Sequence, residues 1–200
     1  MKFLFAILLS LLPLCAMANS FPALFNVAGV ASNDGLNIRS TPNASGAIIG
    51  ALAYNATGVE IIRPSNTGTW GLVNTDEGTG WVSMRFLART TAQWAYPAPA
   101  FCSGTEPFWG LTLSGNGPVA FDLMGGGNML FNTQTQMTAV GRPDRHSFVA
   151  AGTDGILHAV ISHDTCSDGM SDREYGLTLD LIFRGQNGYV QYSGCCSLAQ

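Results

Sequence analysis

The sequence predicts an all-β protein with a small N-terminal β-barrel and a second antiparallel β-barrel that is stapled by disulfides. Residues 20–88 consist of short β-branched or aromatic runs separated by turn residues, without helical periodicity. The same pattern of strands and Gly/Asn/Asp turns continues through residues 102–200. Between them, residues 89–101 contain alternating proline and alanine, which favour an extended linker.

The first residues have the pattern of an export signal. A basic Met1-Lys2 start precedes an apolar stretch from Phe3 to Leu14, and Ala16-Met17-Ala18 has the form of a signal-peptidase site. Lipoprotein processing at Cys15 is the less favoured alternative, because the preceding residue is a leucine rather than a small residue. We therefore expect a signal peptide at residues 1–18, and a mature chain that is periplasmic or secreted, with no membrane span.

The charge distribution supports two domains and excludes several functions. Without Lys2 the chain carries eight arginines, no lysine and thirteen acids, for a net charge of −5. Residues 19–90 are neutral, whereas residues 91–200 carry four arginines against nine acids. The absence of lysine excludes Schiff-base chemistry and a polybasic patch for nucleic acid or membranes.

Six strands are predicted in the first domain. They comprise residues 25–30, 36–39, 48–52, 58–62, 70–73 and 80–83, joined by turns such as Asn33-Asp34-Gly35. Alternation along these strands directs a set of apolar side chains into one core: Leu36, Ile38, Val59, Ile61, Leu72 and Val82. This number of short strands in about sixty residues is typical of a compact barrel.

Several of these segments resemble a bacterial SH3-like domain. The segments are Val27-Ala28-Gly29-Val30, Gly35-Leu36-Asn37-Ile38-Arg39-Ser40-Thr41-Pro42, Ile49-Gly50, Thr69-Trp70-Gly71-Leu72-Val73 and Gly80-Trp81-Val82-Ser83. Their order and spacing match across most of residues 25–88. The resemblance implies a non-enzymatic barrel of an exported protein that binds peptidoglycan or its peptides.

Three side chains of this domain are candidates for ligand binding. Trp70 and Trp81 combine an apolar face with one N–H donor and would line a groove, or else pack in the barrel, which we favour for Trp81. Arg39 would bind a carboxylate of a wall peptide bidentately, or pack its stem on the barrel and pair with a nearby acid.

The second domain, residues 102–200, is predicted to close into an antiparallel barrel of seven or eight strands. The predicted strands are 108–113, 119–123, 129–133, 137–140, 147–150, 156–162, 177–183 and 189–192. Cys102 and Cys166 are each expected to pair with one member of Cys195-Cys196, because a bond between adjacent cysteines is strained. A structural zinc site is the weaker alternative, because adjacent ligands lack the usual spacer.

The same domain has a second resemblance, carried by Cys102-Ser103-Gly104-Thr105-Glu106-Pro107-Phe108-Trp109, by Cys166 to Arg173 and by Gly194-Cys195-Cys196. These motifs resemble a family of exported or lipid-anchored bacterial proteins of uncharacterised function. The resemblance covers most of residues 102–196 and implies no activity.

The densest group of polar residues is Cys166 to Tyr175, which we interpret as a self-bonded loop pinned by a disulfide. If the barrel closes, Glu106 and Trp109 approach this loop, and Arg173 pairs with Glu106 or stacks on Trp109. A structural corner is the favoured interpretation, and a ligand or partner site is the functional one. A hydrolase with Glu106 and either Asp168 or Asp172 as acid and base is an alternative, and so is a loop that inhibits a wall-lytic enzyme.

No cofactor or metal is expected. His158 and His163 lie five residues apart, so on one strand they face opposite sides. The sequence therefore predicts an envelope protein that binds rather than catalyses. Its SH3-like module would engage peptidoglycan or envelope peptides, and its second barrel would engage a small ligand or a protein partner.

Overall fold

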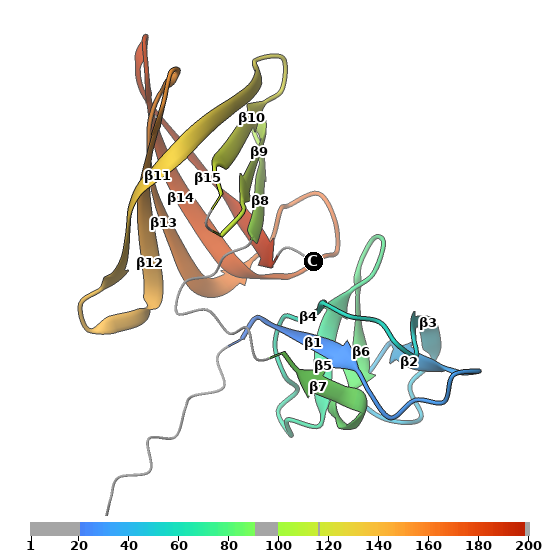
Figure 1. Cartoon of the computed structure of the whole chain (residues 1–200). Helices are drawn as coiled ribbons and strands as arrows, with labels where there is room; N and C mark the ends of the chain where they lie inside the picture. Colours follow the sequence, from blue (N-terminus) through green and yellow to red (C-terminus); the bar gives the residue numbers. More distant parts are fainter. Residues whose placement is uncertain (1–20, 91–99, 116, 199–200) are drawn as a thin grey trace, which may run out of the picture.

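A computed structural model describes residues 21–90, 100–115 and 117–198 of the chain. The expected signal peptide at residues 1–18 and most of the expected linker, residues 91–99, lie outside these ranges. The described residues form two β-structures that lie side by side, with one short 3₁₀ turn at Met84–Phe86 (Figure 1). The predicted all-β class is therefore confirmed. No helix among the described residues is long and apolar enough to cross a membrane.

The first domain consists of two small sheets packed on each other. Its strands are β1 (Ala23–Val27), β2 (Gly35–Arg39), β3 (Ile48–Ala53), β4 (Val59–Ile61), β5 (Trp70–Asn74), β6 (Thr79–Ser83) and β7 (Leu87–Arg89). One sheet has the order β4-β1-β7 and the other β3-β2-β6-β5. All six predicted core side chains are buried. Strand β7 was not predicted, because its three residues are too few to show an alternating pattern.

The second domain is a closed antiparallel barrel with the strand order β10-β11-β12-β13-β14-β15-β8-β9. Its strands are β8 (Ala100–Thr105), β9 (Phe108–Leu113), β10 (Val119–Leu123), β11 (Gly127–Ala139), β12 (Arg142–Gly152), β13 (Gly155–Cys166), β14 (Tyr175–Gly185) and β15 (Gly188–Leu198). The closing pair is β8 with β15, so the first and last strands of this domain lie side by side. The predicted closed barrel is confirmed.

Two strand predictions in this barrel are wrong. Residues 129–133 and 137–139 belong to one long strand, β11, whose register shifts between Thr133 and Thr135, and Val140 lies in the turn that follows. A bulge lets the polar residues between the two predicted strands continue the ladder instead of forming a turn. Strand β8 was missed, and Arg89, Ala100 and Phe101, which the sequence places in the linker, lie in strands.

Aromatic side chains fill the interior of the barrel. Trp109 is 5% exposed, and its ring lies 6.1 Å from both Phe121 and Tyr192, measured between centroids. The ring also lies directly over Gly104, where an added Cβ would meet the indole Nε1. The part of the barrel interior around Trp109 is therefore a packed core.

Both predicted disulfides are present. Cys102 is bonded to Cys196, and Cys166 is bonded to Cys195. Cys102 and Cys196 also face each other in the β8–β15 pairing, so this bridge crosses the closing seam. The Cys166–Cys195 bridge ties the end of β13 to β15 and anchors the loop that follows Cys166.

Candidate functional site

A surface pocket of about 350 Å³ lies on the first domain. Arg39, at the end of β2, and Trp70, at the start of β5, both line it, together with Asp34, Arg85 and Phe86. The fold therefore brings together two of the three binding residues predicted here, although they lie far apart in the sequence.

The guanidinium of Arg39 is held in place from one side. Its Nη1 donates a hydrogen bond of 2.7 Å to the carbonyl oxygen of Gly46, in the loop that connects β2 and β3. The expected pairing with an acid is replaced by this backbone acceptor. An arginine carries five N–H donors, so one bond to a carbonyl leaves donors for a carboxylate of a ligand.

The charges of the pocket favour an anionic group. Arg39 and Arg85 contribute two positive charges against the single carboxylate of Asp34, which accepts the amide N–H of Gly35 at 2.7 Å. The guanidinium of Arg85 lies 4.6 Å from the centroid of the Phe86 ring. Basic side chains beside the half-buried Trp70 ring can hold a carboxylate and an apolar group at the same time.

Trp81 does not belong to the residues that line this pocket. It is half-buried, and the guanidinium carbon of Arg63 lies 5.3 Å from its ring centroid. This contact agrees with the favoured interpretation of Trp81 as a packed residue.

The loop that follows Cys166 is bonded to itself, as the sequence predicts. Asp168 Oδ1 accepts the amide N–H groups of Met170 and Ser171, at 3.0 and 2.9 Å, and its Oδ2 accepts the Ser171 hydroxyl at 2.9 Å. The Tyr175 hydroxyl lies 3.4 Å from the same oxygen. The hydrogen bond from the Ser171 backbone N–H is the largest of the causes that lower the pKa of Asp168. The ionised carboxylate therefore serves to hold the loop.

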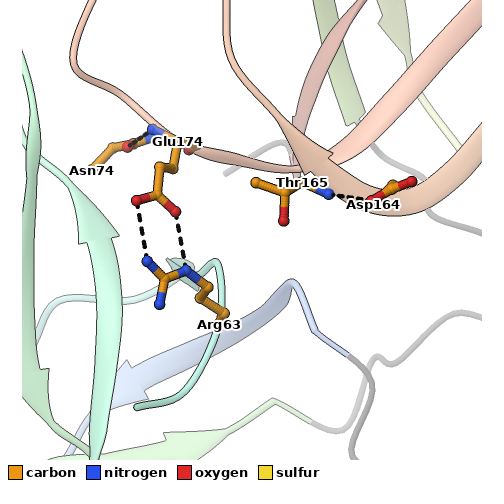
Figure 2. A network of polar contacts seen from close by, with 5 residues as sticks. All are labelled: Arg63, Asn74, Asp164, Thr165 and Glu174. Carbon is orange, nitrogen blue, oxygen red and sulfur yellow. Dashed lines mark hydrogen bonds and ion pairs between the residues drawn. The ribbon is translucent and has the colours of Figure 1, made fainter. Parts of the chain in front are cut away.

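This loop also contacts the first domain, which the sequence did not predict. Glu174 accepts two hydrogen bonds from Arg63, and its backbone exchanges two more with the side chain of Asn74, at 3.0 and 3.2 Å (Figure 2). The amide of Asp172 donates to the carbonyl of Glu77 at 3.1 Å. No local sequence pattern around Arg63 or Glu174 indicates this pairing, which depends on how the two domains are placed.

The prediction that Arg173 pairs with Glu106 or stacks on Trp109 is wrong. Its Nε donates to the backbone carbonyls of Thr75 and Asp76 in the first domain, at 3.2 and 3.1 Å, rather than to Glu106. Trp109 is buried in the barrel, so Arg173 does not stack on it, and Glu106 is exposed in the turn between β8 and β9. Arg173 bonds to this turn of the first domain, rather than to the partners expected from the sequence, because the carbonyls of Thr75 and Asp76 lie within its reach.

A larger cleft of about 790 Å³ lies between the two domains. Glu60, on β4, lines it, and its Oε1 accepts the amide N–H of Leu198 from β15 at 3.1 Å. Burial raises the pKa of this carboxyl from 4.5 to about 7, and the Leu198 amide only partly opposes the shift. Glu60 is not among the residues predicted from the sequence, although an acid inside the apolar run Val59-Glu60-Ile61-Ile62 is itself a signal.

No cluster of three or more histidine, cysteine or acidic side chains within residues 21–90, 100–115 and 117–198 has the arrangement of a metal site. Residues 34–88 match the family model of the bacterial SH3 domain. No curated protein and no solved structure matches the chain. The resemblance stated for the first domain is thus confirmed over most of its length, and bacterial SH3 domains are typically binding modules of the cell wall.

Proposed function

We propose that this protein is an exported, non-enzymatic component of the bacterial cell envelope, and that its SH3-like domain binds peptidoglycan or its peptides. The pocket shared by Arg39 and Trp70 carries the proposal, because it joins a carboxylate-binding guanidinium to an exposed part of an indole ring. The second barrel acts as a rigid partner domain that engages a small ligand or another envelope protein.

Compartment and chemistry both support this function. Two disulfides are expected in a protein that resides in an oxidising compartment, such as the periplasm or the extracellular space. The predicted signal peptide would direct the chain there.

The two alternative functions, a hydrolase and an inhibitor of a wall-lytic enzyme, receive less support from the loop that follows Cys166. In the hydrolase alternative one carboxyl group must act as the general acid, and the lowered pKa of Asp168 leaves that role to Glu106 or Asp172. An inhibitory loop must be free to enter an enzyme, whereas Asp172, Arg173 and Glu174 contact the first domain.

Co-sedimentation of the purified mature protein with peptidoglycan sacculi tests the proposal. We expect the wild type to pellet, and Arg39→Gln to weaken binding by about 10- to 100-fold, the cost of a lost charged hydrogen bond. Trp70→Ala should weaken it similarly, because the apolar face of the pocket is lost. The matched control is Arg184→Gln, which removes an arginine from the outside of β14. Equal pelleting of all four proteins, or of none, would refute the proposal.

A further inference from the structure

The cleft between the domains has a free strand edge on one side. Strand β3 pairs with β2 alone among the described strands, so its other edge has unpaired backbone groups. Four consecutive residues of β3, from Ile49 to Leu52, line the cleft. Since side chains alternate between the two faces of a strand, consecutive lining residues show that the strand borders the cleft with its edge.

Apolar side chains from both domains lie beside this edge. Ile49 is 49% exposed on the first domain, and Phe101, from β8, is 47% exposed on the second. Leu198 lines the same cleft next to Glu60. An extended segment in this position would find apolar contacts on both sides and a backbone to pair with.

Arg173 supplies a fixed positive charge in the cleft. Its Nε is bound to the carbonyls of Thr75 and Asp76, which orients the guanidinium. The four N–H groups of its terminal nitrogens remain for other acceptors, of which the Tyr175 hydroxyl is one. Tyr175 also lines the cleft, so this arginine is positioned by protein groups on more than one side.

We propose that the cleft is a second binding site, for an extended peptide that pairs with the free edge of β3 and ends in a carboxylate held by Arg173. The Glu60 carboxyl group, which also lines the cleft, accepts peptide N–H groups as it accepts that of Leu198. The volume of about 790 Å³ suits a ligand of a few residues. None of the residues that line this cleft lines the Arg39–Trp70 pocket, so the second site goes beyond the proposed wall binding.

The test uses two pools of random-sequence hexapeptides, one with free C-terminal carboxylates and one amidated. Each pool is passed over the immobilised mature protein, and the retained peptides are quantified by mass spectrometry. We expect retention from the carboxylate pool to exceed that from the amidated pool by about tenfold, because a charged hydrogen bond is lost in the amide.

Two variants locate the site. In an Arg39→Gln background, which removes the carboxylate-binding guanidinium of the first pocket, Arg173→Gln should abolish the preference for a free carboxylate. In the same background Ile49→Lys should lower retention of both pools, because it places a charge beside the strand edge. The matched controls are Arg184→Gln and Ile182→Lys, which alter exposed residues of β14 away from the cleft. Intact disulfides and an unchanged thermal midpoint establish that each variant is folded. If Arg173→Gln loosens the contact between the domains, Ile49→Lys still tests the site, because Ile49 takes no part in that contact through hydrogen bonds.

Retention of neither pool would overturn the proposal. Preferential retention of the amidated pool would also overturn it, and would assign the cleft to cationic ligands of Glu60 and Asp76. Sacculus binding that persists in Ile49→Lys separates the two sites, because the wall-binding pocket does not contain this residue.

Discussion

The carboxylate of Glu174 accepts two hydrogen bonds from the guanidinium of Arg63, at 3.0 and 3.1 Å, and this pair joins the two domains. Arg63 follows β4 of the first domain, and Glu174 precedes β14 of the barrel. The two side chains are 44% and 33% exposed. A bidentate pair of this kind fixes the relative orientation of the domains, even where its free energy is modest.

A double-mutant cycle with Arg63→Gln and Glu174→Gln should give a small coupling free energy. We expect about 0.5 kcal/mol from urea unfolding of the oxidised protein, because solvent and salt screen a pair with this exposure. The coupling should fall further in about 1 M salt, where the screening length is only a few ångströms. A coupling of several kcal/mol, unchanged by salt, would show that the pair is desolvated in solution.

Gly104 should tolerate no side chain, because the Trp109 indole and the Ser193 carbonyl occupy the space where a Cβ would be. Gly104→Ala should lower the free energy of unfolding by about 1–3 kcal/mol, the usual cost of overpacking a core. Gly110→Ala, on the adjacent strand, is the matched control, since its nearest neighbour atom is 3.7 Å away in the Phe101 ring. Chemical denaturation of both variants measures the difference. Equal stabilities would mean that the Trp109 ring moves aside without cost.

Local patterns in the sequence were enough to predict those strands whose own residues alternate between apolar and polar. Leu36 and Ile38 alternate with polar residues, and they are buried as predicted. Excluding the bond between adjacent cysteines left two possible pairings, and the structure shows which one forms: Cys102 with Cys196 and Cys166 with Cys195. Strand β8 was missed because Gly104 and Ala100 are residue types depleted in strands, and its pairing with β15 and β9 makes it a strand.

In the candidate sites, too, single residues could be predicted from the sequence, but the contacts between them could not. Arg39 and Trp70 were identified individually, but their shared pocket depends on how β2 and β5 come together. The partners of Arg173 are backbone carbonyls about one hundred residues away, and a carbonyl has no sequence signature. A contact between two domains depends on their orientation, which residue patterns within either domain do not encode.

Glu60 should make the stability of the protein fall as the pH rises. Its pKa is about 7 in the folded protein and near 4.5 in the unfolded chain. Below pH 4.5 both states are protonated, and the carboxyl costs nothing. Between pH 4.5 and 7 the unfolded chain loses its proton first, so the folded state becomes progressively less favoured, by up to about 3 kcal/mol above pH 7.

Unfolding free energies of wild type and Glu60→Gln, measured at about pH 5 and pH 8, test this directly. The amide keeps a carbonyl acceptor for the Leu198 N–H without the buried charge, so Glu60→Gln should be more stable than the wild type at pH 8 and similar at pH 5. Glu77→Gln, an exposed acid of the first domain, is the matched control and should not change the pH dependence. A difference between wild type and Glu60→Gln that is the same at both pH values would show that Glu60 titrates normally, with the cleft open to water around it.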